Sequence, residues 1–284
     1  MIAVNDGSTD NSLKILKAFA AGDKRIRLIS RENKGLVSSL NEGIKLAAGS
    51  FIARMDADDV SEPNRIEIQL DCMLSDPAID VLGTYITAIG DIDSLSRQRT
   101  EQYFNIPLSN DVIDKTIFDK CPFCHPSVMF TKRFILGVGG YPDYKVTEDW
   151  ALWMMALKQG YNMANIPVRL LNYRMRSNSK SNVESKQRQY FYEKALFKFK
   201  SLIESDVAKR SCLIWGAGSG GQIAYEALRD VLPNLNFQGF VDSFKSGTLM
   251  DYKILKPTQL PKEDRPFVFV ASSIGKEEAE DFFI

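Results

Sequence analysis

Apolar positions in the first third of the chain form short runs separated by longer stretches with helical spacing. The runs at 2–4, 26–29 and 51–55 predict strands, because each is short and bounded by polar turn residues. Apolar residues with helical spacing predict three helices. The first has Leu13, Leu16 and Ala20 on one side, and the second has Leu36, Leu40, Ile44 and Ala47 and ends near Gly49. The third begins after Pro63, with Ile66, Leu70 and Met73. This alternation favours an α/β domain with a largely parallel sheet.

The pattern is less regular in the middle of the chain. We expect a strand at 79–89 and a helix that begins at Thr147 and stops at Gly160. A further helical stretch at 190–203 is expected to connect two domains.

The pattern restarts near residue 209. A strand at 212–215, a glycine-rich turn, a helix through Leu228 and strands at 237–241 and 267–271 predict a small Rossmann-like unit. The expected organisation is a domain at 1–180, a helical connector at 181–208 and a Rossmann-like domain at 209–284 that we expect to be incomplete.

Charge and composition narrow the class of protein. The 284 residues include 36 basic and 36 acidic side chains, so no global field favours nucleic acid or an anionic membrane, although a local basic patch stays open. No apolar run approaches the roughly 20 residues that span a bilayer, and the N-terminus has no signal-like pattern. We therefore expect a cytoplasmic protein, compatible with peripheral contact at the inner face of the membrane, whose four cysteines are reduced thiols.

A pair of carboxylates follows the third predicted strand. Asp56 and Asp58 stand at its carboxyl end, which is where open α/β sheets bind ligands. Magnesium and manganese prefer such hard oxygen ligands and use one or two carboxylates together with phosphate oxygens and water. A short acidic turn that caps the next helix is the alternative interpretation of an isolated D-x-D.

The D-x-D belongs to an ordered set of motifs. These are Asn5-Asp6-Gly7-Ser8-Thr9-Asp10, Asn33-Lys34-Gly35-Leu36, Asn41, Arg54-Met55-Asp56-Ala57-Asp58-Asp59, His125-Pro126-Ser127, Gly139-Gly140-Tyr141 and Glu148-Asp149-Trp150. The succession resembles the family 2 glycosyltransferases, which have the GT-A fold, and the resemblance covers roughly residues 1–180.

The resemblance implies a donor, a metal and a reaction. The donor is a nucleotide-diphospho-sugar, UDP-linked, the cofactor is Mn²⁺ or Mg²⁺, and the acceptor is a hydroxyl of a saccharide or lipid-linked saccharide in bacterial surface polysaccharide or glycolipid synthesis. Transfer inverts the anomeric configuration. The implied site residues are Asp6, Gly35, Asn41, Asp56 and Arg176 for the donor; Asp58 and Asp56 for the metal; Asp149 with Glu148 for catalysis; and His125 and Trp150 on the acceptor side.

Each role has a physical reason and an alternative. Asp149 would be the base that takes the acceptor hydroxyl proton, and a helix N-terminus would favour its ionised form. A plain helix cap is the other interpretation of Glu148 and Asp149.

The sequence departs from the family pattern in two places. The family places an apolar strand and a helix before the Asp6 segment, so we expect the sheet to lack its usual first strand. Arg176 stands where the family often has a histidine; it is expected to pair with phosphate or to be a solvated surface arginine.

Cys121-Pro122-Phe123-Cys124-His125 matches the C-x-x-C-H pattern of covalent haem attachment. We reject haem because no export signal accompanies the motif, and zinc because no second pair of ligands exists. His125 is better interpreted as part of the acceptor-side motif or as a structural histidine.

A second nucleotide motif lies in the last third of the chain. Gly216-x-Gly218-x-x-Gly221 follows a predicted strand, and Asp242 comes about 20 residues later, as in a dinucleotide fingerprint. The segment also resembles the N-terminal domain of bacterial sugar O-acyltransferases, where it implies binding of a sugar nucleotide. A purely structural module is the alternative.

Three functions therefore compete: a glycosyltransferase, a sugar-nucleotide-binding or scaffold protein without catalysis, and an NAD-dependent oxidoreductase. Loss of turnover with donor binding kept, on replacing Asp149, would separate the first from the second. The third lacks a catalytic constellation after the glycine motif.

Overall fold

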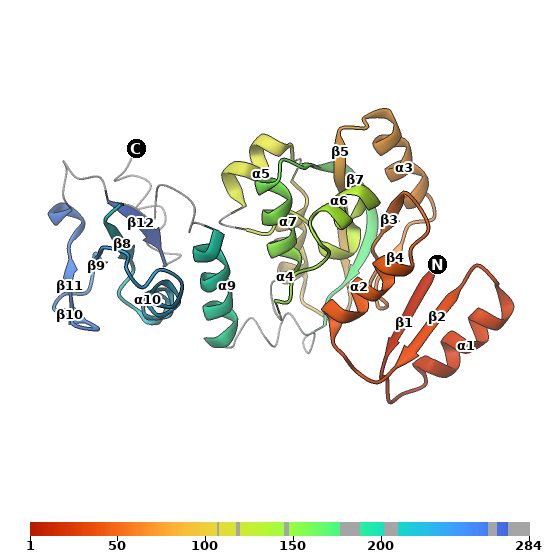
Figure 1. The fold of residues 1–284 in the computed structure, drawn as a ribbon, viewed down its shortest axis with the longest axis horizontal. Coiled ribbons are helices and arrows are strands. Elements are labelled where there is room, and N and C mark those ends of the chain that lie inside the picture. The colour runs from red at the N-terminus through yellow and green to blue at the C-terminus, as the bar shows by residue number, and fades with distance from the viewer. Residues whose placement is uncertain are drawn as a thin grey trace. The chain divides into compact units, whose positions relative to one another are not determined.

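A computed structural model describes residues 1–106, 108–117, 120–144, 148–176, 188–201, 210–260 and 266–271. The chain divides into two compact units, Met1–Ser179 and Lys180–Ile284 (Figure 1). Among the described residues, no helix is long and apolar enough to cross a membrane.

The described residues of the first unit form two sheets. A parallel pair consists of β1 (Ile2–Asp6) and β2 (Arg27–Arg31). The second sheet has the order β3-β6-β5-β7-β4, with β3 (Phe51–Ala53), β4 (Val60–Ser61), β5 (Ile79–Ile89), β6 (Met129–Thr131) and β7 (Asn162–Arg174). Its helices are α1 (Ser12–Gly22), α2 (Leu36–Leu46), α3 (Arg65–Ser75), α4 (Ser94–Phe104), α5 (Asn110–Thr116), α6 (Lys132–Gly137) and α7 (Glu148–Lys158), with a 3₁₀ turn at His125–Ser127.

The expectation of a largely parallel sheet holds only in part. β1–β2 and β5–β7 are parallel, whereas β3, β4 and β6 run antiparallel to the strands beside them. Hydrophobic patterning reports which residues are buried and carries no information on strand direction, so the sequence could not supply this. Thr147, expected to open α7, lies outside the described residues.

The core of the first unit lies where α7 packs beside the sheet. Trp153 is fully buried, and its ring stacks on Phe134 with centroids 6.4 Å apart. Phe123 meets the same indole edge-on at 5.4 Å. α7 is therefore held by large aromatic contacts, which fixes the direction in which its first turn points.

Helix α3 buries a different face from the one its apolar residues predict. Met73 is buried as expected, but Ile66 is 50% exposed, and the other buried positions are Arg65 and Gln69. Arg65 donates to the carbonyls of Arg54 and Val128, and the Gln69 amide donates to those of Leu82 and Ser127. The predicted stripe of Ile66, Leu70 and Met73 was therefore wrong at Ile66, because Arg65 and Gln69 are buried in its place with their hydrogen bonds made.

The second unit is a five-stranded sheet in the order β10-β11-β9-β8-β12, in which β8, β9, β11 and β12 are parallel. Its elements are α9 (Arg188–Ser201), β8 (Cys212–Trp215), α10 (Ser219–Val231), β9 (Phe237–Val241), β10 (Thr248–Leu249), β11 (Tyr252–Leu255), a 3₁₀ turn at Pro257–Gln259, and β12 (Phe267–Val270). The helix expected to connect two domains is α9, which packs against α10 within this unit; Ile203, its expected end, lies outside the described residues.

Candidate active site

The D-x-D segment begins where β3 ends. The Arg54 amide donates to the Val128 carbonyl at 3.0 Å, which holds the chain as it leaves the sheet. The Arg54 guanidinium is buried, and two of its nitrogens each contact one carboxylate oxygen of Asp56 at 2.6 Å. Such a two-point ion pair fixes the orientation of Asp56.

Asp58 is the more open carboxylate, with 43% of its side chain exposed. Arg176 lies beside it, with Nε 3.5 Å from Oδ2. Arg174, at the end of β7, donates through Nε to the Asp58 carbonyl at 2.7 Å. The end of β7 therefore holds the D-x-D turn and brings Arg176, expected to contact the donor, next to Asp58.

Asp59 is a third carboxylate of the same turn, and it is buried. Oδ1 accepts the Arg174 N–H at 2.7 Å, whereas Oδ2 has no hydrogen-bond partner within the part of the chain that is described. Burial raises the pKa of Asp59 to about 6, and the neighbouring charges of Asp56 and Asp58 add to the effect.

Asp149 stands in the first turn of α7 and lies within the electrostatic reach of Arg54. Its Oδ1 accepts the Trp150 N–H at 2.7 Å, and the Cys121 thiol donates to Oδ2 at 3.6 Å. Burial raises the pKa of Asp149, and the Trp150 N–H and the Arg54 charge oppose that rise. Arg54 thus electrostatically couples the base candidate to the D-x-D carboxylate Asp56.

The neighbours of Asp149 point into the protein. Glu148 is 8% exposed, and Trp150 is 4% exposed with its indole N–H donating to the Ile117 carbonyl at 2.6 Å. The structure therefore places the Trp150 ring in the core, where it orients α7, rather than on an open acceptor surface.

His125 is buried and takes part in a contact that reaches α2. Its Nε2 lies 2.7 Å from the Tyr141 hydroxyl. Asn41 pairs with the Tyr141 backbone, accepting its N–H at 2.8 Å and donating to its carbonyl at 2.9 Å. Burial, together with the charge of Arg54, lowers the pKa of His125 well below its usual value, so the imidazole is neutral.

The loop that carries Tyr141 requires glycine. Gly140 has φ +88°, and a Cβ there would lie 2.6 Å from Asn41 Oδ1. Asn41, expected to bind the donor, therefore connects α2 to this loop.

Asp6 and Gly35, both expected on the donor side, contact each other. Asp6 accepts the N–H groups of Lys34 and Gly35 at 2.9 and 2.8 Å and pairs with Arg31. Burial alone would raise the pKa of Asp6, but these N–H groups and the Arg31 charge outweigh it and hold the pKa below its usual value. Gly35 precedes α2 with φ +87°, a conformation that glycine adopts readily.

Sequence reasoning missed Arg54, Tyr141 and Cys121 as site residues. Arg54 could have been recognised from the sequence. A charged residue at the end of an apolar strand needs a partner of opposite charge, and two carboxylates follow it directly. Tyr141 and Cys121 carried none, because their contacts depend on loops that the hydrophobic pattern does not place.

The carboxylate oxygens around Asp58 are suitable ligands for a divalent cation. The described residues contain no preformed group of three or more ligating side chains. The Asp56 and Asp58 side chains are nevertheless partly exposed, and Asp59 adds a buried oxygen that has no hydrogen-bond partner in the described part of the chain. Magnesium and manganese take one or two protein carboxylates and complete their shell with phosphate and water.

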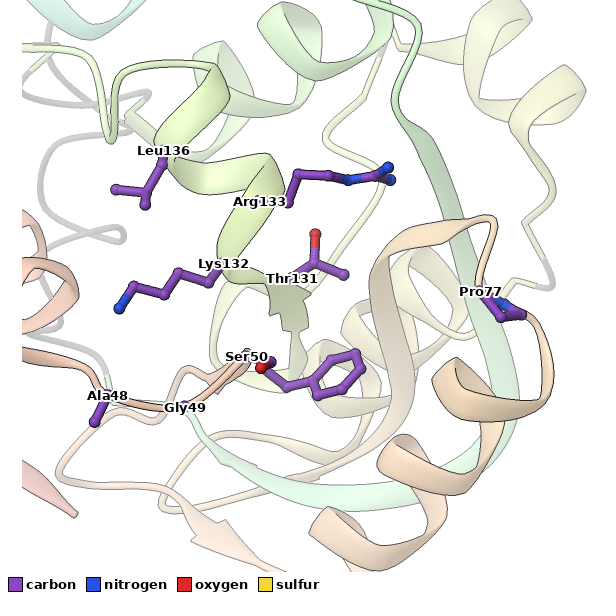
Figure 2. A pocket seen from close by; sticks show the side chains of 9 residues that line it. Ala48, Gly49, Ser50, Pro77, Thr131, Lys132, Arg133 and Leu136 are labelled. Atoms are coloured by element: carbon purple, nitrogen blue, oxygen red, sulfur yellow. The ribbon is translucent and has the colours of Figure 1, made fainter.

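A cavity of about 460 Å³ lies apart from these carboxylates. Figure 2 shows it around the start of β3 and the first turn of α6, lined by Phe51, Lys132 and Leu136 among others. The Lys132 ammonium donates to the Ala47 carbonyl at 2.7 Å. Because the D-x-D follows the opposite end of β3, this cavity does not belong to the carboxylate cluster.

The glycine-rich turn of the second unit is tightly closed. Gly216 has φ +114°. Gly221 lies in α10, and a Cβ there would be 1.9 Å from the Gly216 carbonyl oxygen, so the backbone of α10 packs directly against the backbone of the turn. Gly218 is the N-cap of α10. Asp242 accepts the N–H groups of Ala217, Phe244 and Lys245 at 2.8–2.9 Å. The Asp242 carboxylate, expected to be part of a second nucleotide site, thus already accepts three backbone N–H groups.

Comparisons with known proteins agree with the first unit. The sequence profile described as "Glycosyl transferase family 2" matches residues 1–139. The amylovoran biosynthesis glycosyltransferase AmsE of Erwinia amylovora is 31% identical over 69% of this chain and 70% of its own length. The O-antigen biosynthesis glycosyltransferase WbnJ of Escherichia coli is 33% identical over 63% of this chain and 68% of its own length.

A solved structure supports the fold. Staphylococcus aureus TarS, residues 1–349, superposes with a TM-score of 0.55 at 17% identity, over 82% of this chain and 64% of that one. At that identity the likeness concerns the GT-A-type fold alone. Together with the sequence matches, it shows that this chain is a glycosyltransferase and belongs to glycosyl transferase family 2.

Proposed function

We propose that the chain transfers a sugar from a UDP-linked donor to a hydroxyl of a saccharide or lipid-linked saccharide, with inversion at the anomeric carbon. The observation that carries the proposal is the arrangement around buried Arg54. Arg54 pairs with Asp56 of the D-x-D, and its charge also lowers the pKa of Asp149, which supports one site for the donor diphosphate and the acceptor proton.

The choice of donor and pathway draws on the relatives. The TarS structure is a complex with UDP-GlcNAc, which supports a UDP-linked donor. AmsE and WbnJ are described as enzymes of amylovoran and O-antigen biosynthesis, which supports a bacterial surface polysaccharide as the product.

Asp149 supplies the proton chemistry. Its carboxylate takes the proton of the acceptor hydroxyl while that oxygen forms a bond to the anomeric carbon, and the bond to the diphosphate oxygen breaks with its electron pair. Burial raises the pKa of Asp149, which makes it a better proton acceptor than an exposed carboxylate. The Cys121 thiol and the Trp150 N–H orient the two oxygens.

Asp58 and Asp56 would hold Mn²⁺ or Mg²⁺ with the donor diphosphate. Such an ion, when bound, neutralises the negative charge of the diphosphate leaving group. Arg176, half-exposed beside Asp58, is placed to pair with a phosphate oxygen. Arg54 keeps Asp56 in one orientation by the two-point ion pair.

Calorimetric titration of UDP with and without Mn²⁺ tests the donor site. We expect binding that requires Mn²⁺ and is lost in Asp58→Ala. Asp71→Ala on α3 is the matched control, because it removes an exposed carboxylate that lies outside the D-x-D turn. Equal UDP binding by Asp58→Ala and the unchanged protein would overturn the proposed role of Asp58.

A sugar-nucleotide binder without turnover is the second candidate. One observation favours it: Asp6 and Asp56 already have their carboxylate oxygens engaged by protein groups. Release of UDP from a UDP-sugar on addition of acceptor, absent in Asp149→Asn, would decide for transfer. Donor binding without UDP release from any acceptor would favour the binder.

A further inference from the structure

Two sheets divide the first unit into an N-terminal part, residues 1–47, and a main part, residues 48–176 as far as they are described. The N-terminal part contains β1, β2, α1 and α2 and carries Asp6 and Gly35, whereas the main part contains the five-stranded sheet and carries the D-x-D turn and Asp149. Figure 1 shows β1, β2 and α1 at an edge of the unit. The proposed donor residues come from both parts, so the position of one part relative to the other matters for a ligand that touches both.

Two side chains make the hydrogen bonds that join these parts among the described residues. Asn41, in the middle of α2, accepts the Tyr141 N–H at 2.8 Å and donates to the Tyr141 carbonyl at 2.9 Å. Lys132 donates to the Ala47 carbonyl at 2.7 Å, where the chain passes from one part to the other. A long, flexible lysine at this crossing would tolerate a small rotation of the N-terminal part. The Asn41 contact lies about 9 Å from Ala47 along the helix, so the same rotation would break it.

Arg31 connects Asp6 to the helix that carries Asn41. Its Nε pairs with Glu42 at 2.7 Å, and its other nitrogens pair with Asp6 and donate to the Ser39 hydroxyl at 3.1 Å. The Arg31 side chain is largely buried in this network. Because Glu42 stands next to Asn41 in α2, whatever holds Asn41 also holds the carboxylate of Asp6.

Tyr141 is fixed on the other side, within the main part. Its side chain is 4% exposed, and its hydroxyl lies 2.7 Å from His125 Nε2. The His125 ring meets the Trp153 ring edge-on, with centroids 6.2 Å apart. Trp153 belongs to α7, whose first turn carries Asp149. Contacts between described side chains therefore continue from Asn41 to the helix of the proposed base.

We propose that Asn41 and Tyr141 are positioning residues for glycosyl transfer, whose two-point hydrogen bond sets the N-terminal part against the D-x-D turn and Asp149. The inference rests on the proposed function, in which the diphosphate lies at the D-x-D turn and the nucleoside is left to the part that carries Asp6. Asn41, expected to contact the donor, acts here on the Tyr141 backbone. A ligand that bridges two half-sites held at the right distance gains affinity that neither of its fragments has alone.

Two consecutive glycines offer a matched pair of variants. Gly139 and Gly140 have nearly the same backbone conformation, with φ +85° and +88°, so alanine strains the backbone similarly at both. A Cβ on Gly140 would lie 2.6 Å from Asn41 Oδ1, whereas a Cβ on Gly139 would have nothing within 4 Å. Gly140→Ala therefore pushes the Asn41 amide away from the Tyr141 N–H, and Gly139→Ala leaves it in place.

Calorimetric titration of the whole chain with UDP and with inorganic pyrophosphate, each with Mn²⁺, tests the inference. UDP spans both parts, whereas pyrophosphate needs only the D-x-D turn. We expect Asn41→Ala and Gly140→Ala to weaken UDP binding by about tenfold or more, and pyrophosphate binding by less than about twofold. Gly139→Ala should bind both probes as the unchanged protein does.

An equal loss of UDP affinity in Gly139→Ala would assign the effect to backbone strain and overturn the inference. So would a loss in Asn41→Ala without one in Gly140→Ala, since Asn41 would then contact the donor directly. A parallel loss of pyrophosphate binding would also overturn it, because it would identify a general structural role. UDP binding that none of the variants weakens would overturn the positioning role alone, whereas absence of UDP binding by the unchanged protein would overturn the proposed donor site as well.

Discussion

Each unit has an aspartate at a turn after a strand: Asp59 in the first unit is buried, and Asp242 in the second is half-buried. The protein surrounds these two carboxylates differently. Asp242 in the second unit accepts three backbone N–H groups, whereas Asp59 in the first accepts one and leaves Oδ2 without a partner among the described residues. Burial would raise the pKa of both. In Asp242 the N–H groups outweigh burial and lower the pKa, and in Asp59 burial prevails.

The difference separates a turn that is complete from a turn that is open to a ligand. The second unit's motif uses its carboxylate to close its own loop. The first unit's motif concentrates three carboxylates, Asp56, Asp58 and Asp59, and leaves Oδ2 of buried Asp59 without a hydrogen-bond partner among the described residues. A buried polar atom without a partner is costly, and such atoms are candidates for a functional role.

The strongest test of this comparison is catalysis. Asp149→Asn is expected to lower kcat by roughly 10²- to 10⁴-fold with donor binding kept, because the amide cannot take the acceptor proton. Asp242→Asn is the matched control in the second unit and should leave kcat unchanged. UDP release and UDP titration measure the two quantities, and a similar loss of kcat in both variants would contradict the assignment of chemistry to the first unit.

Gly221→Ala probes the closed turn of the second unit. The new Cβ would lie 1.9 Å from the Gly216 carbonyl oxygen, so the backbone must shift. We expect a loss of about 2–3 kcal/mol in stability, seen as faster hydrogen exchange in β8 and α10. Gly218→Ala is the control, because its Cβ would meet only Lys245 Nζ at 3.7 Å. Equal protection in both variants would show that the turn is not closed as described.

Asp59→Asn is expected to stabilise the first unit at neutral pH. The folded-state pKa of Asp59 is raised to about 6, so the native state binds more protons than the unfolded chain between about pH 4 and 6. Its contribution to stability is thus lost as pH rises through that window. In EDTA, which removes divalent cations, the free energy of unfolding of Asp59→Asn should exceed that of the unchanged protein by on the order of 1–2 kcal/mol at pH 7 and by almost nothing near pH 4. Asp71→Asn is the exposed control; a gain independent of pH would refute the stated cause.

Asp242→Asn should have the opposite pH dependence and the smallest effect. The folded-state pKa of Asp242 is lowered, so its ionised carboxylate contributes stability above its unfolded pKa, about 3.9, and that contribution is lost as pH falls. We expect a loss of about 1 kcal/mol at pH 7, because asparagine still accepts hydrogen bonds without the charge. Hydrogen exchange in the turn at 216–218 measures it, and a stability gain at pH 7 would contradict the account.

Much of the fold could be predicted from the order of apolar runs and turns in the sequence. The strands at β1, β2 and β3, the helices after them, and the glycine turn before α10 follow from local pattern, and so does the position of Asp56 and Asp58 at a strand end. Strand direction and the two-residue β4 could not be predicted, because both depend on partners distant in the sequence.

The site was predicted less completely than the fold. Residue types led to the prediction of Asp58 and Asp149 as site residues, which stays a prediction. The buried Arg54, whose charge acts on both Asp56 and Asp149, was recognised only once β3 and α7 were placed. His125 and Trp150 were expected to face an acceptor, and both are buried, since a motif gives residue identity and not side-chain direction.

The buried polar face of α3 has a consequence for changing this protein. Arg65 and Gln69 hold carbonyl groups from three separated parts of the chain beside the carboxylate turn. A redesign guided by hydropathy would replace these two residues with leucine and would protect Ile66 and Leu74. It would thereby remove hydrogen bonds that attach the D-x-D turn, the proposed donor site, to the fold, and it would preserve two side chains that are mostly exposed.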